Sequence, residues 1–588
     1  MPLSRRDFLK LSAGAAASIP LSRFWIPSGD ALAAAQAKTT LDTTIVKGAL
    51  WKSGTKGAYY RLTTGPGEPH IQRGELGGQS SAPITTALTF VHFTDIHIVD
   101  AQSPARVEFL DRYNDLVCNG TPLDASQRPQ ETMSIQVLES MIRRVRAIQR
   151  GPVTGQPFSF VVCTGDNVDN EQLNELRWFI DTMDGGKTIT PNSGGPTYEG
   201  VQSALWADQE YWHPDRGVTD KYKREFGFPN YPGLLSDAIK PFKATGIGLP
   251  WWQTYGNHDG LMQGNVFRNV AFNLIAVGSL KVVGLPPGAD PCNPFLAFPD
   301  GPARPVTPDP KRQTFRRGDY IAAHFNTTGT PVGHGFTDQN RQSGLAYYVR
   351  DDHPPFRFIS IDTVNPGGYL DGSIGAAQFA WLEQRLIEVS GSYYDADGHQ
   401  VTTDNEDRLV VLFSHHGLRS LNNPVITPNL DDPGSNDLPR VMADEIEALV
   451  HRFPNVIAWF DGHTHNNIID PRPDPTGRTN GFWDVGTAAH VDWICQTRIV
   501  ELAVRADGNI SIFCTMVNHN APADPRGATG VMRLAAIHRE LAANDPQYGF
   551  NGKGPGAPED RNVELTVPGP PWISPVAAQA ARRVRQPA

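Results

Sequence analysis

Short runs of apolar, β-favouring residues recur along this chain and alternate with longer amphipathic segments. One such run, Leu88–Phe93, is followed by a segment near 131–150 whose apolar residues repeat at helical spacing and fall near one face. The next run, Ser159–Cys163, again favours a strand, so this part of the chain predicts the strand–helix–strand unit of a layered α/β fold. A second helix is predicted from Glu171 to Met183.

The same alternation resumes in the second half of the chain. Phe356–Thr363 predicts a strand, and Gln378 opens a helix that reaches about Val389. Further strands are predicted near 408–414, 455–461, 480–487, 497–504 and 509–514.

Two long insertions divide the predicted core domain, 86–520. Residues 185–247 are rich in aromatic and turn residues, and residues 260–355 contain a proline-dense stretch. The aromatic content of both favours folded loops over disorder. The first insertion has two interpretations: a wall or lid of a substrate cleft, or packing over the edge of a sheet. Outside the core, an N-terminal extension is predicted at 38–85 and a C-terminal extension at 521–588.

The composition is that of an ordinary globular protein, with 39% hydrophobic and 19% charged residues among 588. This length has room for one large domain with insertions or for two domains. The formal net charge is −10, and an acidic surface repels polyphosphate backbones, so no nucleic-acid partner is expected. The five cysteines form no Cys-x-x-Cys pair, which argues against a zinc–thiolate site. Cys163 is interpreted as a small buried hydrophobic residue within its strand.

The first 37 residues, 1–37, are predicted to be a signal peptide. The sequence from Ser4 to Lys10, which contains Arg5 and Arg6, resembles the twin-arginine export motif, and an Ala-rich stretch with small-residue cleavage sites follows. The mature protein is therefore expected outside the cytoplasm, as a periplasmic, cell-wall-associated or secreted protein that uses the twin-arginine translocon during export. No later stretch of about 18 apolar residues predicts a transmembrane segment.

Five short polar motifs follow apolar runs and supply oxygen and nitrogen ligands for metal ions. They are Asp95-Ile96-His97, Gly165-Asp166-Asn167-Val168-Asp169, Gly256-Asn257-His258-Asp259, Ser414-His415-His416 and Gly462-His463-Thr464-His465. Because each motif comes where a predicted strand ends, we expect them on loops that converge at one edge of a sheet. Carboxylate, amide and imidazole ligands without thiolates suit iron, manganese or zinc, and argue against calcium or copper-only sites.

This ordered series of motifs resembles the calcineurin-like metallophosphoesterases, a family of two-metal enzymes that cleave phosphate esters. The resemblance implies a four-layer αββα sandwich of two mixed sheets, and two transition-metal ions bridged by Asp166. Two cations roughly 3.5–4 Å apart neutralise charge and activate water for attack on a phosphate ester. The other implied ligands form two sets of three: Asp95, His97 and His465 for the first ion, and Asn257, His415 and His463 for the second.

The same resemblance implies a catalytic role for His258. This residue would approach the substrate phosphate and protonate the leaving oxygen, and Asp95 would orient it. Asn257 would also contact the substrate, and His416 and His490 are further candidate substrate contacts.

Together these features predict an exported, metal-dependent hydrolase of small phosphoric esters, either a phosphodiesterase or a phosphatase, with a metal-activated water or hydroxide as nucleophile. The alternative is a catalytically silent cell-envelope binding protein on the same fold. The enzyme is favoured because degenerate homologues usually lose ligands, whereas here every implied ligand is present. A phosphodiester or bulky monoester substrate is favoured because Asp169 stands where purple acid phosphatases carry a Tyr, and because the aromatic insertion offers an apolar wall.

Overall fold

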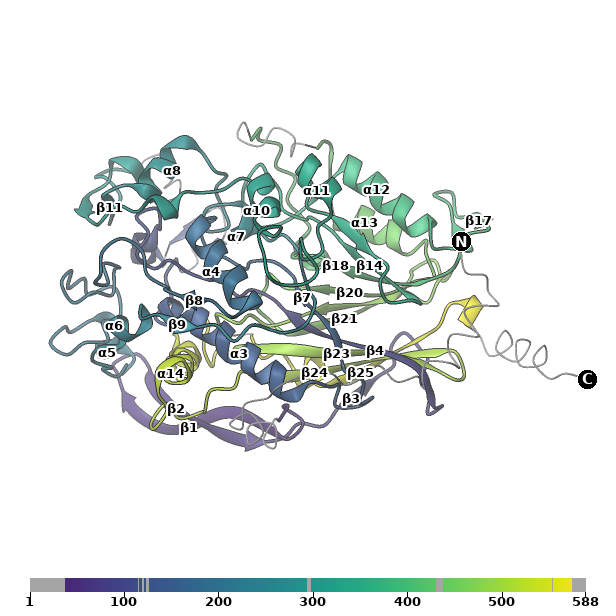
Figure 1. The fold of residues 1–588 in the computed structure, drawn as a ribbon, viewed down its shortest axis with the longest axis horizontal. Coiled ribbons are helices and arrows are strands. Elements are labelled where there is room, and N and C mark those ends of the chain that lie inside the picture. The colour runs from purple at the N-terminus through teal and green to yellow at the C-terminus, as the bar shows by residue number, and fades with distance from the viewer. Residues whose placement is uncertain are drawn as a thin grey trace, which may run out of the picture.

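The structure is a computed structural model in which the larger part of the chain is described. The described residues are 38–114, 116–118, 121–122, 126–292, 298–429, 437–552 and 554–573. The predicted signal peptide, 1–37, lies outside them. The described chain is a mixed α/β protein with several sheets (Figure 1). Within it, no helix combines the length and the apolar character needed to cross a bilayer.

The larger sheet combines segments from both ends of the chain. Its seven strands run in the order β10 (Trp251–Gln253), β7 (Phe158–Cys163), β4 (Ile84–Phe93), β23 (Gln496–Arg505), β24 (Asn509–Asn518), β25 (Val563–Pro568) and β3 (Ile71–Arg73). Strands β10, β7 and β4 pair in parallel, whereas β23, β24 and β25 continue the sheet by antiparallel pairing. Because β25 and β3 lie in the regions predicted as extensions, both extensions contribute strands to this sheet.

The smaller sheet is built from the second half of the chain. Its six strands run in the order β13 (Tyr348–Arg350), β14 (Phe356–Ser360), β18 (Leu409–Phe413), β20 (Val456–Asp461), β22 (Phe482–Gly486) and β21 (Ile468–Arg472). The four central strands are parallel, and the two edge strands pair antiparallel to them. Every strand predicted from the apolar runs is present in one of these two sheets.

The two sheets share one apolar core. The ring of Phe90 in the larger sheet meets the rings of Phe358, Phe413 and Phe460 in the smaller sheet, edge to face, at centroid distances of 6.2, 5.7 and 5.4 Å. Side chains of both sheets belong to a single buried cluster. Since aromatic pairs in this arrangement bury large apolar areas, this cluster holds the sheets face to face.

Helices cover the other face of each sheet. The larger sheet packs against α3 (Ser134–Ile148) and α4 (Leu173–Asp184), and Cys163 lies in this cluster as a buried free thiol, as predicted. The smaller sheet packs against α12 (Ala376–Ile387) and α13 (Ala443–Val450) (Figure 1). The three predicted helices are α3, α4 and α12, with ends that differ by a few residues.

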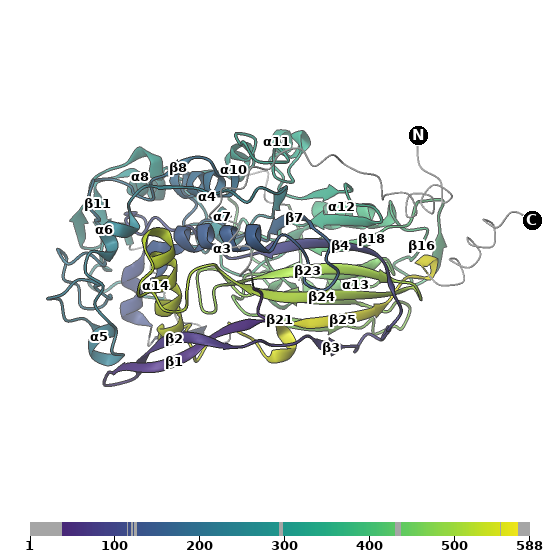
Figure 2. The ribbon, with the colours of Figure 1, turned by 60° about the horizontal axis from the view of Figure 1, so that its bottom comes forward.

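Five aromatic residues of the first insertion pack in one cluster with α14 (Gly530–Asn544). They form a buried cluster that includes Trp212, Tyr222, Phe228, Leu534, Ile537 and Leu541. Helix α14 also lies against α3 and against the hairpin of β1 (Thr43–Ser53) and β2 (Ala58–Pro66) (Figure 2). The structure thus favours the packing interpretation of this insertion over the substrate wall.

The remaining strands form two-stranded sheets, of which β1 with β2 is the longest. The two-stranded sheets are β1 (Thr43–Ser53) with β2 (Ala58–Pro66), β5 (Val117–Cys118) with β6 (Thr121–Pro122), β8 (Thr188–Ile189) with β9 (Phe242–Lys243), β11 (Leu280–Val282) with β12 (Ala303–Pro305), β15 (Ile374–Gly375) with β19 (Arg440–Val441), and β16 (Ser392–Tyr394) with β17 (Gln400–Thr402). The other helices are α5 (Lys221–Glu225), α6 (Leu234–Ala238), α7 (Asn257–Gly260), α8 (Val270–Val277), α10 (Arg317–Ala323) and α11 (Asp338–Ser343).

Candidate metal centre

The five polar motifs follow the carboxyl ends of five strands. Asp95, Asp166 and Asn257 come after β4, β7 and β10, which are parallel neighbours in the larger sheet. His415 and His463 come after β18 and β20, which are parallel neighbours in the smaller sheet. The ligands therefore gather where edges of both sheets meet, and not at the edge of one sheet alone. Groups of their ligand atoms lie within 4.8 Å of one another.

One group joins a carboxylate to two imidazoles. His465 Nε2 lies 3.3 Å from Asp95 Oδ1 and 3.2 Å from His97 Nε2. His97 Nε2 lies 4.0 Å from Asp95 Oδ1. All three side chains are buried or nearly so, and their ligand atoms face a common point.

Asp166 links this group to the remaining residues. Its Oδ2 lies 3.7 Å from His97 Nε2 and 3.1 Å from His415 Nε2. The His463 ring lies 5.2 Å from the His415 ring, centroid to centroid. Asn257 is buried, and its amide Nδ2 donates to the Gly264 carbonyl at 3.1 Å. Asp166 thus lies between both sets of candidate ligands, the position a bridging carboxylate needs.

Three of the imidazoles share one orientation. In each, Nδ1 contacts an oxygen that can only accept a hydrogen bond, so Nδ1 carries the proton and donates it. The pairs are His97 with Asp169 Oδ1 (3.1 Å), His415 with the Thr164 carbonyl (2.8 Å), and His465 with Asp492 Oδ2 (2.6 Å). In a neutral ring this places a lone pair on each Nε2, and these are the atoms that face the centre.

The orientation of these three rings indicates whether the residues can bind metal ions. Lone pairs of imidazole and carboxylate that face each other at 3–4 Å repel, unless a proton or a cation lies between them. Asn257 Oδ1 and His415 Nε2 are buried without a hydrogen-bond partner; His415 Nε2 is close to Asp166 but outside hydrogen-bond geometry. Buried polar atoms are rarely left unsatisfied. A ligating histidine usually donates its other ring N–H to a carboxylate or carbonyl, and three histidines here do so. The residues fit a metal centre.

The charges at the centre are strongly coupled. Burial by itself raises the pKa of Asp166. The charges of His415 and His258 lower it by more, so that the pKa lies well below its usual range. Burial lowers the pKa of His415, yet the Asp166 carboxylate raises it to about 9. Burial likewise lowers the pKa of His465, and Asp95 and Asp492 raise it to about 10. A metal ion would take the place of these protons, because ligands must be deprotonated to bind.

The backbone is unusual at the same positions. Asp95, His97, Asp166, His463 and His465 have φ values of 49°, 46°, 49°, 65° and 56°. Such left-handed conformations are uncommon for residues other than glycine, and they persist where surrounding structure enforces them, often at functional sites. Five of the seven candidate ligands therefore occupy strained backbone positions.

His258 lies beside the centre but contacts a different aspartate from the one predicted. Its Nδ1 donates to the Asp169 carbonyl at 2.8 Å and lies 3.6 Å from Asp169 Oδ1. Its backbone N–H donates to Asp166 Oδ1 at 2.8 Å. The carboxylate of Asp95 instead accepts from the His463 backbone and faces His465. Asp169, and not Asp95, thus lies beside the ring, and an orienting role for Asp95 stays a prediction.

His416 and His490 are close to the centre but buried. His416 Nε2 donates to the Leu370 carbonyl at 2.9 Å, so its Nδ1 accepts from the Thr363 hydroxyl at 2.9 Å. The backbone of His490 donates to the Asp95 carbonyl at 3.1 Å, and its ring packs on Phe93. Substrate contact by either ring stays a prediction.

Several supporting residues escaped the sequence analysis. Asp492 accepts from His465, and Asp371 Oδ1 lies 3.5 Å from His463 Nε2. Arg106 is buried and pairs with Asp169. No spacing distinguishes these side chains from the many other acidic and basic residues of the chain, so only the folded structure identifies them.

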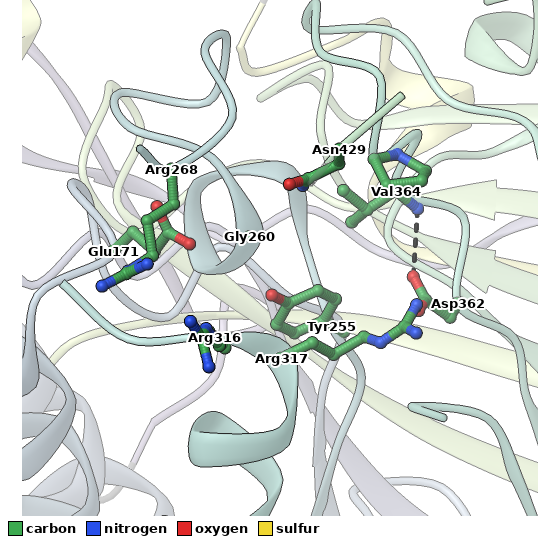
Figure 3. A pocket seen from close by; sticks show the side chains of 10 residues that line it. Glu171, Tyr255, Gly260, Arg268, Arg316, Arg317, Asp362, Val364 and Asn429 are labelled. Carbon is green, nitrogen blue, oxygen red and sulfur yellow. Dashed lines mark hydrogen bonds and ion pairs between the residues drawn. The ribbon is translucent and has the colours of Figure 1, made fainter. Parts of the chain in front are cut away.

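A separate pocket adjoins α7 (Figure 3). It is lined by Glu171, Tyr255, Gly260, Arg268, Arg316, Arg317, Asp362, Val364, Pro366 and Asn429. Gly260 is the last residue of α7, whose first residue is the candidate ligand Asn257. None of the seven candidate ligands is among the lining residues, so pocket and metal centre are neighbouring but distinct.

No family model matches the chain, and no curated protein matches it. Among solved structures, the crystal structure of a dimetal phosphatase from Danio rerio is similar, at 11% sequence identity with a TM-score of 0.33. The match covers 74% of this chain and 99% of the phosphatase. A likeness this low assigns neither fold nor function by itself.

Proposed function

We propose that this chain is a binuclear-metal hydrolase of phosphoric esters, a phosphodiesterase or phosphatase, of the calcineurin-like metallophosphoesterase family. The observation that carries the proposal is the shared orientation of His97, His415 and His465, whose Nε2 atoms face a buried group of carboxylates. The four-layer αββα sandwich is part of the same proposal. It is supported by the core that the two sheets share and by the helices on both outer faces.

The proposed ligand sets are those that the sequence resemblance implies, and the contacts of Asp166 with His97 and His415 support them. Asp166 would bridge two ions, with Asp95, His97 and His465 on the first and Asn257, His415 and His463 on the second. The mixed nitrogen and oxygen ligands suit iron, manganese or zinc. When bound, two such cations would neutralise charge on the phosphate group and activate water for attack.

The role proposed for His258 is proton transfer to the leaving alcohol oxygen. With Nδ1–H bound to the Asp169 carbonyl, Nε2 is the ring atom left for the substrate. The Asp169 carboxylate also lies beside the ring, with Oδ1 3.6 Å from Nδ1. The hydrogen bond from the His258 backbone to Asp166 keeps this ring beside the ligands.

The proposal places the protein outside the cytoplasm. Export through the twin-arginine pathway is supported by Arg5 and Arg6 and by the Ala-rich stretch that follows. The alternative, a silent binding protein of the cell envelope, predicts bound metal without turnover.

The test combines metal analysis with turnover of a panel of phosphate monoesters and diesters. We expect close to two transition-metal ions per chain, and chelation should remove metals and activity together. Asp166→Ala should lose both, because it removes the bridging carboxylate. Asp397→Ala is the matched control, since Asp397 belongs to a more exposed group with Asp395 and His399 whose ligand atoms also lie within 4.8 Å of one another. Full metal content in Asp166→Ala would contradict the proposed bridge.

A further inference from the structure

Three large apolar side chains are exposed next to the candidate metal centre. Tyr369, Leu370 and Ile426 have exposed fractions of 65%, 42% and 65%, and we call these three residues the apolar rim. Groups of exposed apolar side chains often mark binding sites, whereas scattered single ones need no explanation. Whether the apolar rim marks a binding site therefore depends on where it lies relative to the candidate metal centre.

The segments that carry the rim are tied to each other. The Asn365 amide donates to the carbonyls of Asn423 and Val425, at 3.1 and 3.0 Å. The Asn423 amide donates in return to the carbonyls of Gly368 and Asp371, at 2.9 and 2.7 Å. Both amides are buried, so the rim stands on a well-bonded support.

One side of this support contacts the second set of candidate ligands. The Leu370 carbonyl accepts from His416 Nε2 at 2.9 Å. The next residue, Asp371, places Oδ1 3.5 Å from Nε2 of the candidate ligand His463. Leu370 is therefore a single residue away from a contact with the proposed metal centre.

The other side contacts the residues around His258. The Tyr369 N–H donates to the Asn265 carbonyl at 2.8 Å. The neighbouring Gly264 accepts from the Asn257 amide at 3.1 Å, and a Cβ at Gly264 would lie 2.4 Å from His258 Nε2. Tyr369 is thus attached both to the side of the centre that holds His258 and to the side that holds His463.

Tyr369 also has a strained backbone, with φ of 69°. An aromatic residue rarely adopts this conformation, which glycine or asparagine tolerates better. Strain of this kind persists where the surrounding structure enforces it, and it gathers at binding and active sites. The strain thus adds to the contacts in marking Tyr369 as part of the site.

We propose that the apolar rim binds an apolar aryl or alkyl group on the alcohol part of the phosphate ester, which makes esters of bulky apolar alcohols the substrate class. The inference rests on the proposed function, because a phosphate held beside His258 and the metal ligands leaves its alcohol group to emerge towards this rim. It moves the expected apolar wall from the first insertion, whose aromatics are buried against α14, to the segments of Tyr369 and Ile426.

The test compares 1-naphthyl phosphate with ethyl phosphate in the metal-loaded full-length protein. Tyr369→Asn removes the ring while it keeps a residue that tolerates the left-handed backbone, and Tyr369→Phe keeps the ring. We expect Tyr369→Asn to raise KM for 1-naphthyl phosphate about 5- to 20-fold, because the naphthyl group loses part of the apolar surface that buries it. The same variant should raise KM for ethyl phosphate less than about 2-fold, because the ethyl group is too small to bury much surface. Tyr369→Phe should resemble the wild type. Leu370→Asn should follow Tyr369→Asn, whereas its matched control Leu205→Asn, at an 88% exposed leucine, should change neither KM.

Equal changes for both substrates, or no change for 1-naphthyl phosphate, would overturn the inference. Equilibrium dialysis with 1-naphthylphosphonate, which cannot be hydrolysed, gives a readout without turnover. If the wild type cleaves no ester, the proposed function fails. Weaker phosphonate binding by Tyr369→Asn than by the wild type would still uphold the rim. Equal binding by both, or no binding by the wild type, would refute it.

Discussion

Replacement of Asp492 by asparagine should weaken metal binding without unfolding the protein. Asp492 accepts the Nδ1–H of His465 at 2.6 Å through Oδ2, and Arg128 lies 2.8 Å from Oδ1. Burial raises the pKa of Asp492, but Arg128 and His465 lower it, so the carboxylate is ionised at neutral pH. This negative charge makes His465 a better ligand and holds its Nε2 towards Asp95.

The size of the effect follows from the bond that is lost. Asparagine is nearly isosteric, but it has one accepting oxygen and no charge, so it cannot serve both His465 and Arg128. Loss of an outer carboxylate of this kind costs about 10- to 100-fold in metal affinity, or about 1.4–2.7 kcal/mol. Asp492→Ala should be worse, because it also leaves the nearly buried Arg128 without this partner, at a cost of about 3–5 kcal/mol to the free energy of unfolding.

The assay is competition for metal with a chromophoric chelator, together with urea unfolding of the metal-free protein. Glu540→Gln is the control. Glu540, on α14, is an equally buried carboxylate that pairs with Arg61 of β2 and accepts from Tyr59 and Tyr231, and none of these three residues is a candidate ligand. This variant should reduce the free energy of unfolding and leave the metal dissociation constant unchanged. Metal affinity of Asp492→Asn within about twofold of the wild type would show that His465 is not a ligand held by this contact.

Variants of His258, Asn257 and the Arg5-Arg6 pair test other parts of the proposed function. His258→Ala should keep its metal content and lower kcat by about 10²–10⁴, the usual contribution of a positioned general acid; the loss should shrink for nitrophenyl esters, whose leaving groups depart without a proton, and equal losses across leaving groups would contradict the acid role. Asn257→Ala, in contrast, should weaken binding of the second metal, and excess metal should restore part of its rate. Arg5→Lys combined with Arg6→Lys should block export, which N-terminal sequencing and fractionation would check; normal export of the double variant would exclude the twin-arginine pathway.

Much of the architecture is legible in local sequence patterns. The run Leu88–Phe93 predicts β4, and the helical periodicity of 131–150 predicts α3. Burial sets the spacing of the apolar residues within a segment, so the segment's own sequence is enough to indicate a helix or a strand. The polar motifs stand out for the same reason, since each interrupts an apolar run at its end. The motifs that contain the candidate ligands are therefore available from the sequence, and the resemblance to the metallophosphoesterases implies which of their residues bind metal.

What the sequence does not reveal are contacts between residues distant along the chain. Strand β3 pairs with β25, and the aromatics of the first insertion pack on α14, from segments hundreds of residues apart. Local periodicity carries no information on such partners, because any apolar face can in principle cover another. The sequence alone therefore leaves two interpretations of the first insertion, and the contact with α14 distinguishes them.

The contrast between what the sequence predicts and what the tertiary structure adds is clearest at the candidate metal centre. The sequence by itself determined which side chains can bind metal, because ligand chemistry belongs to the residue type. Only the tertiary structure decided how they are oriented: Asp169 and not Asp95 lies beside His258, Asp492 accepts from His465, and the Tyr369 N–H donates to the Asn265 carbonyl. These are orientations of hydrogen bonds across separate strands and loops, and they exist only once both sheets have packed together and brought their edges into contact.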